Sequence, residues 1–422
     1  MSAATVTLVI LVLAAICFVT EIIPLAVTAM SVIVLLAVTN VLTTKEALAG
    51  LSDLNVVLFA GMFVVGAAIF QTGLAKRIGD SVVKATGKGE VRLIIGVMLI
   101  AAILSSLLSN TGTTAVLLPV TIGIARSAGI SKSKSLLPLA LAAGLGGIMT
   151  LVGTPPNLVV NGVLDAGDFR PFSFFEYAYI GIPLTLVGII YIVTIGRRLL
   201  PNRTEGDSGS HGENEEKVFR TDKQWIAGAV LLVVVFMMAF EKEVGIPLAV
   251  TAVAGALIMV LTGCLSEREA YDSIDWTTIF LFAGMLPLAA AMEKTGAGSL
   301  IANTVINIMG ENPSPYILVI VMFLLTSGLT QFMSNTASSA LLAPIGVAIA
   351  QGLGASPHAV LMTIAVAAST AFATPVGTPP NTLVLGPGGY HFIDYIKIGL
   401  PLILVCFLVS IVLIPLIWPF YP

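Results

Sequence analysis

Four short motifs occur twice in this chain, in the same order and with nearly the same separation. They are IPLAVTA at Ile23 and Ile246, FAGM at Phe59 and Phe282, SNT at Ser109 and Ser334, and GTPPN at Gly153 and Gly377. The separations are 223, 223, 225 and 224 residues (246 − 23, 282 − 59, 334 − 109 and 377 − 153). A separation that holds over the whole chain indicates a tandem duplication. We therefore expect two copies of one structural unit.

Apolar runs of helical length fill both copies. Hydrophobic residues make up 57% of the 422 residues and charged residues only 10%, which excludes a soluble domain with a polar surface. Because lipid offers no hydrogen-bond partner to the backbone, each apolar run must form a helix. The short alternating segments of a membrane β-barrel are absent from the sequence. The chain is thus predicted to be an all-α polytopic membrane protein.

Each copy contains the same series of predicted elements. In the first copy, residues 1–200, we expect spans at 5–20, 24–42, 54–73 and 177–200, an apolar pair around SNT at 91–126, and a run interrupted by GTPPN at 135–164. In the second copy, residues 224–422, the spans are 224–240, 246–263, 276–293 and 395–418, the SNT pair is 315–352, and the interrupted run is 358–387. Residues 201–223 are polar and rich in Gly, Ser and Glu, as in a solvated linker. No basic segment precedes residues 5–20, so we interpret them as a retained span rather than a cleaved signal.

The topology follows from the two SNT pairs. If each pair enters the membrane and returns on the same side, as a re-entrant hairpin, each copy crosses five times and the two copies are inverted relative to each other. Lysines and arginines are enriched on cytoplasmic flanks. With the linker placed inside, only Lys45, Arg170, Lys242 and Lys294 of the 20 basic residues fall outside. This distribution favours the inverted arrangement, with both termini outside.

The repeated motifs interrupt apolar runs, and inverted repeats with such breaks are typical of secondary transporters. In both copies of GTPPN two prolines follow a Gly-Thr pair, so the helix must stop there and leave backbone carbonyls free. Such carbonyls, with Ser, Thr and Asn oxygens, suit a small cation, and helix N-termini suit an anion. A single such break is often only a kink, but four breaks paired by symmetry indicate one shared site near mid-membrane.

The absence of charge from the inner parts of the spans constrains the coupling. No Asp, Glu, Lys or Arg lies there in the predicted spans, which disfavours proton coupling. An anion bound without Lys or Arg must be balanced by helix dipoles and by co-bound cations. Cys17, Cys264 and Cys406 are far apart in apolar runs, and neither a disulfide framework nor a metal centre is indicated. No paired nucleophile and base lies in the spans, which argues against an intramembrane enzyme.

SNT in both pairs, followed by GTPPN in both interrupted runs, resembles the divalent anion:sodium symporter family, whose members carry dicarboxylates, citrate or sulfate. The closing stretch from Ala373 to Pro401 is similar to that family's last broken helix and the helix after it. The resemblance covers nearly the whole chain, although the family commonly has one more helix ahead of the first repeat. It implies a homodimer in which the hairpins and broken helices move together, as an elevator, against a scaffold of the other helices.

The resemblance also implies site residues. Sodium, the coupling ion, would bind at two places, and no organic cofactor is implied. The first sodium site would comprise Ser105, Ser109, Asn110 and the carbonyl of Gly153, and the second Thr330, Asn335 and the carbonyls of Met333 and Gly377. The substrate would meet Asn110, Thr111 and Thr154 from the first copy and Ser334, Asn335, Thr336, Thr378 and Pro379 from the second.

The sequence therefore predicts an elevator-type symporter in the cell membrane, in a prokaryote the inner membrane, with no enzymatic activity and no nucleic-acid partner. The predicted substrate is a divalent anion, in particular a C4-dicarboxylate such as succinate or malate. A sulfate symporter or a dicarboxylate exchanger on the same scaffold remains the alternative, because SNT and GTPPN do not distinguish them. A channel is less consistent with a closed, symmetric site.

Overall fold

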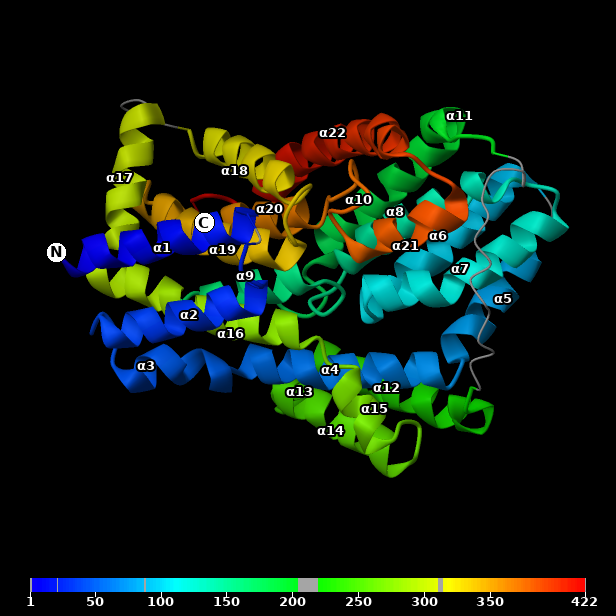
Figure 1. The fold of residues 1–422 in the computed structure, drawn as a ribbon, viewed down its shortest axis with the longest axis horizontal. Helices are drawn as coiled ribbons and strands as arrows, with labels where there is room; N and C mark the ends of the chain where they lie inside the picture. The colour runs from blue at the N-terminus through cyan, green and yellow to red at the C-terminus, as the bar shows by residue number, and fades with distance from the viewer. Residues whose placement is uncertain (1, 21, 87–88, 204–218, 310–313, 422) are drawn as a thin grey trace.

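The computed structural model describes residues 2–20, 22–86, 89–203, 219–309 and 314–421, and over these ranges every regular element is a helix (Figure 1). Seven of the described helices are long and apolar enough to cross a membrane. They are Ala3–Thr20, Thr44–Gln71, Glu90–Leu107, Ala178–Leu199, Thr221–Ala239, Trp276–Thr295 and Phe392–Ile417. Two other predicted spans are shorter, since α2 (Leu25–Val38) and α14 (Leu248–Leu261) have 14 residues each. The predicted all-α membrane fold is confirmed.

The order of the helices repeats along the chain. The first series is α1 (Ala3–Thr20), α2, α4 (Leu54–Gln71), α5 (Leu74–Thr86), α6 (Glu90–Leu107), α7 (Asn110–Ser127), α8 (Leu136–Gly147), α9 (Pro155–Ala166) and α10 (Ala178–Tyr191). The second is α12 (Gln224–Ala239), α14, α16 (Trp276–Thr295), α17 (Ala297–Met309), α18 (Pro315–Leu329), α19 (Asn335–Gly352), α20 (His358–Ala368), α21 (Pro379–Gly388) and α22 (Phe392–Ile417). Most of the predicted linker, 204–218, lies outside the described residues.

Two equivalent helix contacts join the two copies. α2 packs on α16, and its counterpart α14 packs on α4 (Figure 1). A Cβ at Gly284 would lie 2.5 Å from the carbonyl oxygen of Ala29, and one at Gly61 would lie 2.7 Å from the carbonyl carbon of Ala252. The repeated FAGM motif thus supplies a glycine against which the alanine of the other copy's IPLAVTA packs. We call these four helices the scaffold.

The last helix of each copy holds the interrupted run of that copy in place. A Cβ at Gly181, in α10, would lie 2.7 Å from the Cα of Met149, and one at Gly399, in α22, would lie 2.0 Å from the carbonyl oxygen of Phe372. α10 and α22 also pack on each other. The hairpins, the interrupted runs and these two helices form the other part of the molecule, which we call the mobile half after the movement proposed for it below.

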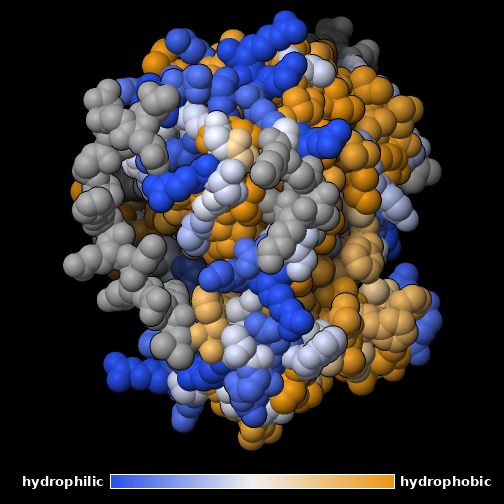
Figure 2. All heavy atoms as spheres, turned by 90° about the vertical axis from the view of Figure 1, so that its right-hand side faces the viewer, coloured by the Kyte–Doolittle hydropathy of each residue, from blue (hydrophilic) through white to orange (hydrophobic). Residues whose placement is uncertain are grey.

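Ion pairs link residues that the predicted topology places on the same side of the membrane. Lys294 Nζ lies 2.8 Å from Glu46 on the predicted outer side. On the linker side Arg203 lies 3.0 Å from Asp394 and Arg220 lies 2.8 Å from Glu269. The hydrogen bond from Arg220 lowers the pKa of Glu269 to about 2. Figure 2 views the end that carries α5, α7 and α11 (Arg197–Leu199), where hydrophilic residues gather beside an apolar flank.

Candidate functional site

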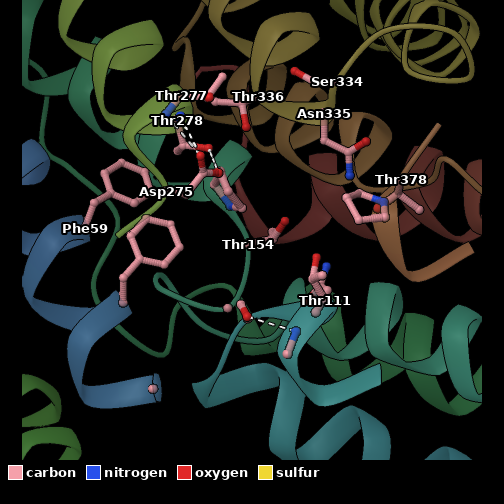
Figure 3. A pocket seen from close by; sticks show the side chains of 18 of the residues that line it. Phe59, Thr111, Thr154, Asp275, Thr277, Thr278, Ser334, Asn335, Thr336 and Thr378 are labelled. Atoms are coloured by element: carbon pink, nitrogen blue, oxygen red, sulfur yellow. Dashed lines mark hydrogen bonds between the residues drawn. The ribbon is translucent and has the colours of Figure 1, made fainter. Parts of the chain in front are cut away.

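The two hairpin tips and the two GTPPN loops meet around one cavity of about 630 Å³ (Figure 3). Thr111 from the first copy lies on one side, Asn335 and Thr336 from the second on the other, and Thr154 between them. Twelve of the fourteen residues predicted for the site line this cavity. They are Ser109, Asn110, Thr111, Gly153, Thr154, Met333, Ser334, Asn335, Thr336, Gly377, Thr378 and Pro379. The other two, Ser105 and Thr330, are fully buried directly behind Asn110 and Asn335.

Each SNT motif forms the turn at a hairpin tip and the start of its second helix. Ser109 is the N-cap of α7, where its hydroxyl accepts the N–H of Gly112 at 3.1 Å. Ser334 caps α19 in the same way, accepting the N–H of Ala337 at 3.0 Å. The first residues of both helices therefore point their N–H groups and the positive end of the helix dipole toward the cavity. Serine is needed there as a cap, and asparagine and threonine supply the polar side chains.

Each GTPPN motif ends one half-helix and begins the next. Its prolines occupy the first two positions of α9 and of α21 and carry no N–H, so backbone N–H donors at a helix start must come from α7 and α19. The asparagine of the motif holds the loop: Asn157 donates to the carbonyl of Thr150 at 2.8 Å, and Asn381 to that of Thr374 at 2.8 Å. The motif's asparagine is thus structural in both copies, while its Gly and Thr face the cavity.

Oxygen atoms converge on the carboxamide of Asn110. One terminal atom of this amide lies 2.6 Å from Ser105 Oγ, 3.1 Å from the carbonyl oxygen of Ala143 and 3.2 Å from that of Gly153. With its nitrogen turned inward, the amide donates to these oxygens. With its oxygen turned inward, the four oxygens form the kind of set that binds a hard cation such as sodium. The residues present therefore fit a sodium ion, and Ala143 joins the predicted set.

A second oxygen cluster occupies the equivalent place in the second copy. Thr330 Oγ1 lies 2.8 Å from Asn335 Oδ1 and 2.7 Å from the carbonyl oxygen of Ala368. The two clusters are not identical, because a Cβ at Gly147 would lie 2.5 Å from Asn110 Oδ1, whereas the counterpart of Gly147 is Ala371. Only the first cluster requires a glycine there. The second also fits a small cation by its donor chemistry.

The rest of the cavity wall suits an anion that carries its own hydrogen-bond acceptors. The Thr154 hydroxyl is buried without a hydrogen-bond partner among the described residues. None of the lining residues in the described part of the chain is Lys or Arg. A carboxylate would therefore be held by hydroxyls, amides and helix N-termini.

Sequence reasoning missed several residues of the wall. Asp275 lies at the cavity and caps α16, accepting from the N–H of Thr277 at 3.1 Å and from the hydroxyl of Thr278 at 2.6 Å. Asp275 lies one residue before the predicted span 276–293, and this position could have identified it as the N-cap of that helix. Three aromatic side chains of α4, Phe59, Phe63 and Phe70, also line the cavity. Their spacing of four and seven residues places them on one face of the helix. This face cannot be recognised from the sequence, because the other residues of the span are also apolar.

The two hairpins are attached to their GTPPN loops by different means. In the second copy the buried Gln331 side chain donates to the carbonyl of Thr370 at 3.0 Å and accepts the N–H of Ala373 at 2.9 Å. The side chain of its counterpart Ser106 bonds only within its own helix, to the carbonyl of Ile103. Both copies share one further bond, in which the carbonyl of Ser106 accepts from the Thr150 hydroxyl and that of Gln331 from the Thr374 hydroxyl. In the first copy the hairpin helix α6 instead packs closely on α8, since a Cβ at Gly146 would lie 2.3 Å from the carbonyl oxygen of Ala102.

This difference predicts unequal effects of one substitution at two equivalent positions. Gln331→Ala would leave the N–H of Ala373 buried and unpaired, while the carbonyl of Thr370 keeps the N–H of Phe372, so we expect a loss of about 1–3 kcal/mol of stability. Ser106→Ala removes only a local bond, and its loss should stay below about 0.5 kcal/mol. Thermal unfolding of the two purified variants beside the wild type measures both. Equal losses would contradict the proposed difference between the joints.

Comparison with known proteins gives one family model and several relatives. A model described as citrate transporter (CitMHS) matches residues 15–364. An uncharacterized transporter of Haemophilus influenzae is 30% identical, over 94% of this chain and 88% of its own. The sodium-dependent dicarboxylate transporter SdcS of Staphylococcus saprophyticus is 27% identical, over 88% of this chain and 78% of its own.

Two solved structures share the fold. The YdaH transporter of Alcanivorax borkumensis matches with a TM-score of 0.60 at 17% identity, over 87% of this chain and 86% of its own. MtrF of Neisseria gonorrhoeae matches with a TM-score of 0.64 at 16% identity, over 98% of this chain and 94% of its own. At these identities the likeness concerns the fold alone.

Proposed function

The chain belongs to the citrate transporter family, and from this premise we propose that it is a sodium-coupled symporter of a divalent anion, in particular a C4-dicarboxylate. The predicted resemblance to the divalent anion:sodium symporters is confirmed, and the protein is a multi-pass membrane transporter rather than an enzyme. The observation that carries the proposal is the pairing of two oxygen clusters with one cavity that lacks Lys and Arg in its described lining.

We assign one sodium ion to each oxygen cluster. Ser105, Asn110 and the carbonyls of Ala143 and Gly153 would hold one sodium ion, and Thr330, Asn335 and the carbonyl of Ala368 a second. We leave Ser109, which was predicted as a sodium ligand, out of this set, because its hydroxyl caps the N-terminus of α7. The carbonyls of Met333 and Gly377, also predicted as ligands, lie at the same cavity.

The dianion would lie between the hairpin tips. Thr111 and the unpartnered hydroxyl of Thr154 would donate from the first copy, and Asn335, Thr336 and Thr378 from the second. Ser334 would act through the helix N-terminus that it caps, and Pro379 would only shape the wall, because it has no N–H. The sodium charge on either side would balance the two carboxylates, which explains how a site without Lys or Arg can hold them.

The energetics agree with two or more sodium ions. At about 100 mV, negative inside, and with a tenfold gradient, each entering sodium ion releases about 3.7 kcal/mol. Moving a dianion inward costs about 4.6 kcal/mol. Two sodium ions therefore leave about 2.8 kcal/mol, on the order of 100-fold accumulation of the dianion. We further propose that the protein acts as a homodimer in the cell membrane and that the mobile half moves as an elevator.

Uptake of radiolabelled succinate into proteoliposomes tests the proposal. We expect uptake with an inward sodium gradient and none with potassium or proton gradients, and we expect malate to compete but not sulfate. Replacing sodium by potassium on both sides should abolish uptake, because each oxygen cluster fits a small hard cation.

Two other results would replace the proposal. Sodium-independent uptake that requires internal dicarboxylate would identify an exchanger. Sodium-driven sulfate entry without succinate uptake would identify a sulfate symporter.

A further inference from the structure

The cavity opens toward the linker end of the molecule. Ser273 and Asp275 line it, and they follow α15 (Glu267–Asp272), whose Glu269 binds Arg220 at the end of the linker. Leu25, at the start of α2, lines it as well. In the predicted topology this is the cytoplasmic side. The structure therefore corresponds to one of the two states that an alternating-access transporter must visit.

In this state one half-helix of the mobile half rests on the scaffold. α9 packs on α16, and a Cβ at Gly162 would lie 2.4 Å from Cζ of Phe282 and 3.2 Å from Cδ2 of Leu286. Gly162 is buried, so the backbone of α9 directly contacts these two side chains. A side chain at this position would require the ring of Phe282 or α9 itself to shift.

The equivalent glycine of the second copy has no such contact. Gly386 occupies the same place in α21 as Gly162 in α9, nine residues after the glycine of each GTPPN motif. It is exposed, and no heavy atom among the described residues lies within 4 Å of a Cβ built on it. Nor does the sequence require a glycine there for the backbone, because Gly386 lies within a helix and not at a left-handed turn.

The surface that would receive Gly386 faces the cavity. The counterparts of Phe282 and Leu286 in the first copy are Phe59 and Phe63, because FAGM begins at both Phe59 and Phe282. Both line the cavity (Figure 3 labels Phe59). An aromatic face of α4 and an uncovered glycine face of α21 are therefore both present and separated in this state.

We propose that α21 docks on α4 in the opposite state, with Gly386 against Phe59 and Phe63, as Gly162 docks against Phe282 and Leu286 here. This inference rests on the elevator movement proposed above, and it identifies the surface on which the mobile half would come to rest in the opposite state. The two scaffold positions are close together, since the rings of Phe59 and Phe282 are 5.4 Å apart. The distance that the mobile half moves is therefore set by the separation between Gly162 and Gly386.

The size of the movement follows from helix geometry. Gly162 is seven residues after Pro155, so it lies about 10 Å along α9 from the cavity. Gly386 lies equally far along α21 on the other side. Exchanging one glycine for the other moves the mobile half by at most about 20 Å.

Cross-linking tests the docking without any substrate. In a chain whose three cysteines are replaced by alanine, Phe59→Cys is combined with Gly386→Cys, and a protease site is inserted within 204–218. Each member of the pair lies in a different copy, so a short bis-maleimide holds the two fragments together on a denaturing gel. Phe282→Cys with Gly162→Cys reports the present state. Phe59→Cys with Gly328→Cys is the control, because Gly328, in α18, also has open space around it.

We expect at least about a tenfold excess of linked product from the Phe59–Gly386 pair over the control, because an irreversible linker accumulates even a minor state. The inference is overturned if that pair links no better than the control while the Phe282–Gly162 pair links. Because linking requires no transported solute, failure of the proposed substrate would leave this result unchanged.

A bulky side chain gives a second, functional test. Gly386→Trp has room in the present state but would block docking on Phe59 and Phe63. We expect an unchanged melting temperature and sodium-driven uptake reduced at least about tenfold, since the opposite state becomes inaccessible. Gly328→Trp, the same change at a glycine with open space around it and no part in the proposed docking, should retain uptake. Full uptake by Gly386→Trp would overturn the inference.

Discussion

Asn110→Ala and Asn335→Ala should each reduce sodium-driven uptake to background while the protein still folds. Each asparagine places its carboxamide at the centre of one oxygen cluster, with one terminal atom of Asn110 2.6 Å from Ser105 Oγ and Asn335 Oδ1 2.8 Å from Thr330 Oγ1. Alanine removes the carboxamide and leaves the buried Ser105 hydroxyl without its partner, at about 1–3 kcal/mol, whereas the Thr330 hydroxyl keeps the carbonyl of Ala368. In both variants the anion loses a balancing charge, and in Asn335→Ala it also loses a donor, so the losses in sodium and substrate binding reinforce each other.

The measurement is the initial rate of uptake, combined with the rise in melting temperature that sodium produces in the purified protein. Wild-type protein should be stabilised by sodium, because a ligand that binds only the folded state raises stability. Each variant should lose most of this stabilisation. Asn303→Ala is the matched control, because Asn303 is exposed on α17, away from the cavity lining. Full transport by either cavity variant would remove both asparagines from the proposed site.

Much of this site could be predicted from the sequence because the duplication locates it twice. SNT and GTPPN are polar breaks in apolar runs, and the predicted inverted arrangement would bring the four breaks together. Twelve of the fourteen predicted residues line one cavity, in agreement with this expected convergence. The remaining two, Ser105 and Thr330, are one helical turn before the tips, and they bond to the asparagines from behind.

Other features depend on contacts between segments far apart in the chain. α5 carries the exposed Lys76 and Arg77, so its sequence does not form an apolar run and it was not predicted as an element. The carbonyl of Ala143 joins the first oxygen cluster only because α8 ends beside the hairpin. No residue type signals such a contribution, because every residue has a carbonyl.

The same limit applies to differences between the copies. Gln331 and Ser106 are aligned by the repeat, yet only the structure reveals that glutamine spans a joint that close packing makes in the first copy. The requirement for a glycine at Gly147, and not at Ala371, likewise follows from the position of the Asn110 amide. Sequence symmetry predicts where the two halves correspond, whereas packing decides how each half is held.

Gly61→Leu and Gly284→Leu should each prevent the scaffold from assembling. A Cβ at Gly61 would lie 2.7 Å from the carbonyl carbon of Ala252, and one at Gly284 would lie 2.5 Å from the carbonyl oxygen of Ala29. Backbone atoms cannot rotate away as the end of a side chain can, so the helices must separate. In membranes, close backbone approach at small residues is a main source of helix association. We expect a loss of at least about 3 kcal/mol for each change, the upper end for overpacking.

Size-exclusion chromatography and thermal unfolding of the detergent-purified variants measure this loss. Gly328→Leu introduces the same side chain at a helical glycine with open space around it, and it should behave as the wild type. Gly61→Ala and Gly284→Ala should be intermediate, because even a methyl group collides with the neighbouring backbone. Since the two contacts are related by the repeat, the two leucine variants should lose similar stability. A wild-type melting temperature in either one would mean that the scaffold helices can separate at that point, and the four helices would then not form the rigid partner that an elevator movement requires.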